Sequence, residues 1–264
     1  MTSVSRLNIG FPLRAFGWFV LAGIAAGASA APVDPGIAQF KPFVVKGVGE
    51  SLASARKMRD SIAAHDLQGA QQAWLGARAG WEQAEVITDE FFPDLDDAID
   101  SWPNGKTGFH SIEARLFGAH ETDSLAQADE LVKNLTYFDE KLKSVTLTQQ
   151  GLLNGLTKLA YEVGENKADG GESQFAGTSL ADMIANVDGI RTAYKYVFAA
   201  RLKSKDPVLA ATAEKDIAQL GAVLKAPDLK SLDADALLSD SEDLAATLQA
   251  AAAPLGLTKP ALGD

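Results

Sequence analysis

The sequence predicts an all-α fold of the helical-bundle class. Apolar residues recur at spacings of three and four along most of the chain, alanine is abundant, and no stretch shows the alternating β-branched pattern of a strand. About eight amphipathic helices without a convincing sheet are typical of helical bundles. A small-residue and acid pattern occurs at 73–85 and again at 181–194. This repetition indicates either a duplicated four-helix bundle or a chance similarity between alanine-rich helices.

The N-terminus has the pattern of a secretory signal peptide over residues 1–30. Arg6 and Arg14 precede an apolar, small-residue stretch from Phe16 to Ala28, and the sequence A-S-A at 28–30 fits a cleavage site. The apolar run is short for a membrane span, although a single-pass anchor is the alternative. We therefore expect a mature chain that begins near Ala31, is exported to the periplasm and is not inserted in the membrane after cleavage.

Helix boundaries follow from the apolar stripes and from residues that start or stop a helix. Asp66 is expected to cap the second helix, and Pro207 is expected in the first turn of a later one. The stretch 165–175 is polar and rich in glycine, so an exposed loop is expected there. A division near Val145 separates an N-terminal bundle, residues 31–145, from a C-terminal bundle, residues 146–264. Helices are expected at 37–64, 67–88, from about 109, 124–143, 148–163, 180–203, 207–224 and 239–252.

The charge balance excludes some partners and some ligand types. The chain has 24 basic and 35 acidic residues, a formal net charge of −11, and no cysteine. An acidic surface is unsuited to nucleic acid or to an anionic membrane, because both attract basic footprints. Without cysteine, disulfides, a lipid-modified N-terminal cysteine and thiolate metal ligands are all excluded. Any metal ion bound by this chain must be held by oxygen and nitrogen.

The segment from Trp102 to Gly118 contains the most informative motif. Thr107 is the expected N-cap of a helix that begins near Phe109, and His110 and Glu113 lie three residues apart on this helix. Positions i and i+3 are roughly 60° apart around a helix, so the two side chains leave the same face. An imidazole and a carboxylate placed in this way are able to bind one cation together.

Acidic residues precede this motif along the chain. Glu82 and Glu85 are again three residues apart on a predicted helix, which a short connection joins to the His110 helix. Three further acids lie on that connection: Asp94, Asp96 and Asp100. If the two helices pack antiparallel, the carboxylates face His110. The result would be a metal site rich in oxygen and poor in nitrogen, and a solvated acidic surface is the alternative.

The ligand types narrow the choice of metal. One imidazole with several carboxylates favours Fe²⁺, Mn²⁺ or Zn²⁺ over Cu⁺, and leaves Cu²⁺ open. Arg78 and Arg115 are candidates to hold the carboxylates in place. No G-x-S-x-G, phosphate loop, dinucleotide fingerprint or H-E-x-x-H motif is present. His65 and His120 are expected on the surface, and Trp74, Trp81 and Trp102 are expected as core anchors.

At these residues the sequence resembles the imelysin-like proteins, which include the EfeO and EfeM periplasmic components of bacterial iron uptake. The resemblance covers most of the mature chain in the same order. It is carried by A-R-A-G-W-E-Q-A-E at 77–85, D-L-D-D-A-I-D at 94–100, G-x-H-x-x-E at 108–113, E-S-Q-F-A-G-T-S-L-A-D-M-I-A-N-V-D-G at 172–189, A-Y at 193–194 and K-D-P-V-L-A at 205–210.

The resemblance implies a pair of four-helix bundles with a cleft between them, and a metal site around the His-x-x-Glu motif. Iron is the expected metal, with zinc and copper as alternatives. The first predicted helix follows closely on the cleavage site, so the short form without an N-terminal cupredoxin domain is expected. Carried over position by position, the ligands are His110 and Glu113, then Glu82 and Asp96, then Glu85 and Asp100. By the same matching, the residues that line the cleft are Asp182, Asn186 and Asp188.

Three functions are consistent with the sequence. The leading hypothesis is a periplasmic protein that binds iron and delivers it to an inner-membrane permease. The first alternative is a metallopeptidase, in which Glu113 would be a metal ligand or the general base. The second is a binder of acidic polysaccharide such as alginate, held through bridging cations or through the basic residues Lys195, Arg201, Lys203 and Lys205.

Overall fold

The computed structural model describes residues 34–101, 106–165, 167 and 172–262. Throughout these residues the regular structure is helical and contains no strand, which confirms the all-α prediction. The predicted signal peptide and Trp102 lie outside the described residues. Among the helices that are described, none combines the length and the apolar character that a membrane span requires.

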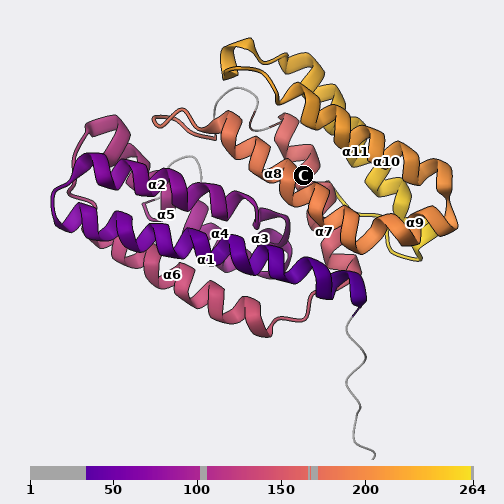
Figure 1. The fold of residues 1–264 in the computed structure, drawn as a ribbon, viewed down its shortest axis with the longest axis horizontal. Helices are drawn as coiled ribbons and strands as arrows, with labels where there is room; N and C mark the ends of the chain where they lie inside the picture. The colour runs from indigo at the N-terminus through magenta and orange to yellow at the C-terminus, as the bar shows by residue number, and fades with distance from the viewer. Residues whose placement is uncertain (1–33, 102–105, 166, 168–171, 263–264) are drawn as a thin grey trace, which may run out of the picture. The chain divides into compact units, whose positions relative to one another are not determined.

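The N-terminal part is built on three long helices that lie side by side (Figure 1). Helix α1 packs along both α2 and α6, because its apolar stripe of three- and four-residue spacings is buried along its whole length. Asp66 caps α2 by accepting a hydrogen bond from the Gly69 amide, as expected. The bounds are α1 Pro35–Ala63, α2 Leu67–Glu82 and α6 Leu125–Ser144.

Short helices lie between α2 and α6 and differ from the expected pattern. The predicted helix over 67–88 ends at Glu82, and a new helix begins at Glu85. The acidic connection forms a helix of its own, because Pro93, whose φ is fixed, takes the first helical position after Phe92, which has the non-helical angles φ −146° and ψ 46°. A π-helical segment directly follows Glu113. The bounds are α3 Glu85–Phe91, α4 Pro93–Asp100, α5 Gly108–Glu113 and the π-helix η1 Ala114–Ala119.

The C-terminal part is formed mainly by α7, α8, α10 and α11, with α11 packed on α7 and on α10. Asp206 caps α10 by accepting from the Leu209 amide, and Pro207 takes the first turn. The helix expected over 180–203 includes a π-helical turn before it continues to Lys205. The bounds are α7 Gln149–Glu165, α8 Ser179–Ala193, the π-helix η2 Tyr194–Phe198, α9 Ala199–Lys205, α10 Pro207–Val223, the 3-10 helix η3 Leu229–Ser231 and α11 Ala234–Leu255.

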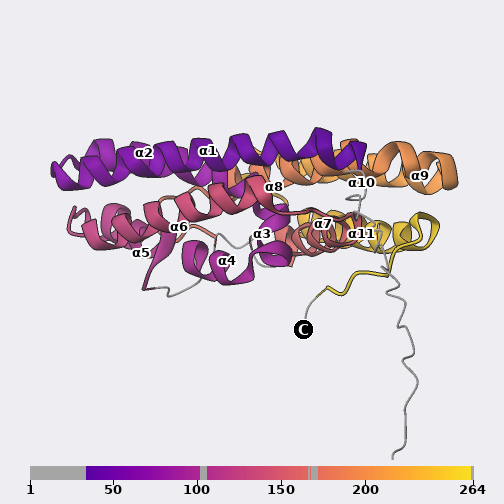
Figure 2. The same ribbon diagram turned by 90° about the horizontal axis from the view of Figure 1, so that it is seen from below.

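The two parts are in contact through α2 with α8 and through α3 with α7. Figure 2 shows α1, α2, α9 and α10 in one layer, with α5, α6, α7 and α11 in the other. The approach of α7 to α3 is close, since a Cβ at Gly155 would lie 2.2 Å from the carbonyl oxygen of Val86. The buried core runs through both parts and includes Trp74 and Trp81, the predicted anchors. The division into two domains at residue 145 stays a prediction.

Candidate metal centre

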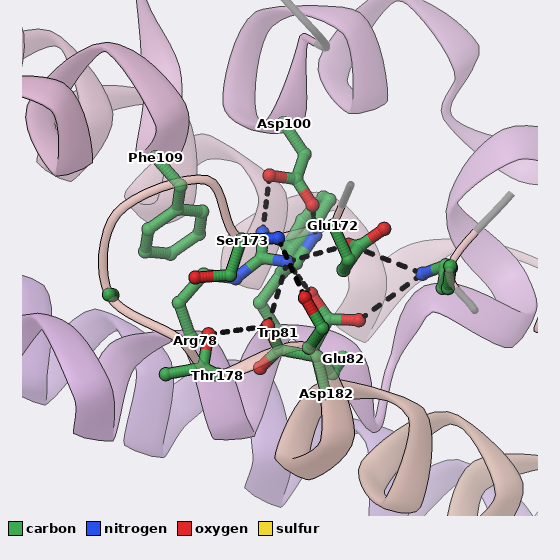
Figure 3. A network of polar contacts seen from close by, with 12 residues as sticks. Arg78, Trp81, Glu82, Asp100, Phe109, Glu172, Ser173, Thr178 and Asp182 are labelled. Atoms are coloured by element: carbon green, nitrogen blue, oxygen red, sulfur yellow. Dashed lines mark hydrogen bonds and ion pairs between the residues drawn. The ribbon is translucent and has the colours of Figure 1, made fainter. Parts of the chain in front are cut away.

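A buried guanidinium lies at the centre of the polar network in Figure 3. Arg78, on α2, is 1% exposed, and it packs against the rings of Phe109 and Trp74 at 5.4 and 6.0 Å. Removing a charged group from water is costly unless opposite charges compensate it. Arg78 forms ion pairs with four carboxylates, those of Glu82, Asp100, Glu172 at 2.8 Å and Asp182 at 3.6 Å.

Asp100 connects this guanidinium to His110. Its Oδ2 accepts a hydrogen bond of 2.7 Å from Trp81 Nε1, and its Oδ1 lies 3.1 Å from His110 Nε2. Burial alone would raise the pKa of Asp100, but the charges of Arg78 and His110 outweigh it and hold that pKa well below its usual range. Burial likewise lowers the pKa of His110, yet the neighbouring Asp100 raises it to about 9. At neutral pH the metal-free His110 imidazole is therefore protonated, and it is paired with carboxylates.

The second nitrogen of His110 faces Glu113, as the three-residue spacing predicts. His110 Nδ1 lies 3.2 Å from Glu113 Oε2. The other oxygen, Oε1, accepts hydrogen bonds from Ser173 Oγ at 2.8 Å and from the amides of Phe175 at 2.9 Å and Ala176 at 2.8 Å. Burial raises the pKa of Glu113, but His110 and these donors together lower it to about 2. Glu113 is an ionised carboxylate that fixes the imidazole ring and ties α5 to the loop before α8.

The position of α5 depends on Gly108. This residue has φ +75°, a backbone conformation that residues other than glycine rarely adopt. A Cβ there would also lie 2.3 Å from the carbonyl oxygen of Ile99, so the chain passes close to the end of α4 before α5 begins. Thr107 is the N-cap residue, as expected, although its side chain makes no capping hydrogen bond. The glycine thus brings His110 within reach of Asp100.

A lysine lies on the other side of the carboxylates. The Lys167 ammonium is 2.9 Å from Glu85 Oε2, 3.3 Å from Glu172 Oε1 and 3.5 Å from Glu82 Oε2. It also donates to Asn186 Oδ1 at 3.0 Å. Burial is the main reason that the pKa of Glu85 is raised to about 7, against the opposing charge of Lys167.

Helix α8 contributes two of the residues matched to the family motif. Asp182 pairs with Arg78 and accepts a hydrogen bond of 2.7 Å from Thr178 Oγ1. Asn186 Nδ2 donates to Glu82 Oε2 at 2.8 Å and to the Glu82 carbonyl at 3.0 Å, where α2 ends. Asp188, in contrast, is half-buried, and its Oδ1 lies 3.5 Å from Arg191 Nη1.

Two groups of side chains within the described residues have ligand atoms close enough to hold an ion. The ligand atoms in each group lie within 4.8 Å of one another. The first group is Asp100, His110 and Glu172; the second is Glu82, Glu85, Asp100 and Glu172. Four of the six predicted ligands are therefore brought together: His110, Glu82, Glu85 and Asp100.

The other two predicted ligands lie outside these groups. Glu113 is behind His110 and uses both oxygens for the hydrogen bonds described above. Asp96 lines a small pocket beside α7 together with Asp89, Lys158, Glu162 and also Glu85, which belongs to the second group. Burial there raises the pKa of Asp96 to about 7, against a hydrogen bond from Thr88. The ligand role of all six residues stays a prediction.

Sequence reasoning missed Glu172 and Lys167, because it treated 165–175 as an exposed loop. Glu165, Gln174 and Phe175 are exposed as expected, and residues 166 and 168–171 lie outside the described residues. The expectation was wrong for Lys167 and Ser173, which are 4% and 5% exposed and contact the site. The available signal was the match of the E-S-Q-F stretch to the family. The expectation for Arg78 was correct, but Arg115 pairs with Glu121 and Asp123 on the surface instead. His65 and His120 are exposed, as expected.

Fold and site together define an all-α protein with a buried cluster of carboxylates and one imidazole, a donor set suited to cations with oxygen and nitrogen ligands. The family model described as imelysin matches residues 37–258, and the chain belongs to the imelysin family.

Relatives of known name agree with this assignment. The chain is 31% identical to the iron uptake system component EfeO of Yersinia pseudotuberculosis over 183 residues, 63% of this chain and 48% of that protein. It is 26% identical to an EfeM/EfeO family lipoprotein of Staphylococcus haemolyticus over 213 residues, 75% of this chain and 72% of that protein. The chain thus spans about half the length of the EfeO protein it matches, and the resemblance to EfeO/EfeM-type components is confirmed.

A solved structure has the same fold. It is a protein from Parabacteroides distasonis, proposed to be an iron-regulated protein A precursor. It aligns with a TM-score of 0.68 at 16% identity and covers 86% of this chain and 97% of its own. At this identity the likeness extends to the fold alone.

Proposed function

We propose that this chain is a periplasmic component of iron uptake that binds an iron ion through Asp100, His110 and Glu172 and presents it to an inner-membrane permease. The observation that carries the proposal is the convergence of these three side chains, whose ligand atoms lie within 4.8 Å of one another. The names of the EfeO and EfeM/EfeO relatives favour iron among the metals that such ligands accept.

The surroundings of His110 support a role as ligand. Metal-binding histidines commonly donate their second ring N–H to a carboxylate, which fixes the tautomer and the orientation of the ring. Glu113 supplies that carboxylate at 3.2 Å from Nδ1, which leaves Nε2 directed at Asp100 and the site. In this proposal Glu113 orients the ligand, and iron replaces the proton that the imidazole carries in the metal-free protein.

The environment of Glu113 also favours binding over peptide hydrolysis. A general base must accept a proton near neutral pH, and a carboxylate suits that task when its pKa lies near 7. The pKa of Glu113 is instead lowered to about 2, and Oε1 is occupied by three donors. The metallopeptidase alternative would be supported if the protein hydrolysed casein and if both a chelator and Glu113→Gln abolished this activity.

The test is calorimetric titration of the purified protein with Fe²⁺ under anaerobic conditions, and with Fe³⁺, Zn²⁺ and Cu²⁺. His110→Ala is expected to abolish high-affinity iron binding, and Glu113→Gln is expected to weaken it about 10- to 100-fold. His120→Ala is the matched control, because that imidazole is exposed and belongs to neither ligand group. Equal iron affinity in wild type and His110→Ala would refute the proposal.

A further inference from the structure

The two candidate ligand groups describe two cation positions that share side chains. Asp100 and Glu172 belong to both groups, so two ions bound there would be bridged by carboxylates. His110 belongs to the first position alone, and Glu82 and Glu85 to the second alone. Carboxylate-bridged metal pairs are a common arrangement in helical bundles that supply Glu and His from facing helices.

In this protein a side chain already occupies the second position. The Lys167 ammonium contacts Glu82, Glu85 and Glu172 at 2.9 to 3.5 Å, and these are three of the four carboxylates of the second group. An ammonium is a compact point charge with three donors, and here its contacts are oxygens, as those of a hard metal ion would be. Asn186 Oδ1 adds a fourth oxygen at 3.0 Å.

We propose that Lys167 is a specificity-determining residue that fills the second cation position and so restricts the site to a single metal ion. The inference rests on the proposed function for the first position, at Asp100, His110 and Glu172. An ion in the second position would have to expel the ammonium, because Lys167 pairs with three of the four carboxylates that would hold the ion.

Burial makes this expulsion costly. Lys167 is 4% exposed, and its Nζ has four oxygen contacts within the protein. Breaking a buried ion pair leaves an uncompensated charge and typically costs about 3–5 kcal/mol. The first position differs from the second: Arg78 pairs with its two carboxylates, Asp100 and Glu172, but His110 adds a nitrogen ligand that the second position lacks. We therefore expect a single metal ion bound per chain, which is consistent with a protein that delivers iron to a permease.

The experiment counts Mn²⁺ ions bound per chain after equilibrium dialysis, by elemental analysis, and records the electron paramagnetic resonance spectrum of the bound ions. Wild type is expected to bind one Mn²⁺ with the spectrum of an isolated ion. Lys167→Met is expected to bind two, with the broadened spectrum of an exchange-coupled pair. Lys167→Met combined with Glu85→Gln is expected to return toward one ion, because it removes a carboxylate that serves the second position alone.

Lys158→Met is the matched control. Lys158 also pairs with acids, Asp89 at 2.7 Å and Glu162 at 3.7 Å, but neither acid belongs to a ligand group, so replacing Lys158 is expected to leave one ion bound. Lys167→Gln, which keeps a polar side chain, is the second variant if Lys167→Met does not fold, and it too is expected to bind two ions. Two ions in wild type, or one in a folded Lys167 variant, would overturn the inference. No ion in wild type would refute the proposed function itself.

Discussion

Arg78 offers the sharpest test of how this site is held together without metal. The perturbation is Arg78→Met, which keeps a long apolar side chain against Phe109 and Trp74 but removes the guanidinium. Arg78 is 1% exposed and pairs with four carboxylates, so the variant leaves buried negative charges that only Lys167 and His110 then offset. Loss of one partner of a buried ion pair typically costs about 3–5 kcal/mol.

The assay is urea unfolding followed by circular dichroism at pH 7.5 in the presence of a chelator. With a denaturant dependence of about 3 kcal/mol per molar urea, a loss of about 3–5 kcal/mol lowers the unfolding midpoint by roughly 1 to 1.7 M. The loss of unfolding free energy in Arg78→Met should be smaller at pH 5, because the carboxylates that no longer pair with Arg78 bind protons more readily at that pH. Part of it should also return when Mn²⁺ replaces the missing positive charge.

Arg59→Met is the matched control for this experiment. Arg59 also pairs with two acids, Asp60 and Asp129, but at the surface, where water screens the charges. Its replacement should leave the unfolding midpoint unchanged. Equal midpoints for Arg78→Met and wild type would show that the buried pairs do not stabilise the fold, and would refute the reasoning.

Two further predictions follow. Gly108→Ala places a Cβ against the Ile99 carbonyl in a residue with φ +75°, so the free energy of unfolding in urea should fall by about 1–3 kcal/mol and iron binding should weaken. Gly49→Ala is the control: a Cβ there lies in open space on α1, so the free energy of unfolding should not fall. The thermal midpoint of the metal-free protein should fall as pH rises from 5 to 9. Asp182, with a folded pKa raised by burial to about 7, and His110, raised to about 9, both bind protons more tightly when folded. Their stabilising contributions are present below the unfolded pKa values and are lost as pH rises through 7 and 9. A midpoint that rises over this range would contradict the assignment.

Features that depend on residues close together in the chain, such as helix faces and helix caps, could be predicted from the sequence. The spacing of apolar residues along α1 and α6 reports which face is buried, and Asp66 and Asp206 carry their capping role in the side chain itself. The His110–Glu113 contact follows from helix geometry alone. The end of α2 at Glu82 does not follow from local geometry, because the spacing of apolar residues continues past it. Asn186, on α8, supports this helix end by donating a hydrogen bond to the Glu82 carbonyl.

Local patterns along the chain specify the helical fold, the buried stripes and a set of acids near one histidine. Which of those acids meet depends on long-range packing: it brings Glu172 and Lys167 into the cluster from a stretch expected at the surface, and it leaves Asp96 outside both ligand groups, in a pocket that it shares with Glu85. Periodicity states that a side chain faces inward, but it carries no information about which distant residue lies opposite. The partners of Arg78 and Lys167 are up to 104 residues away along the chain, and packing of helices from both parts of the protein was needed to place them.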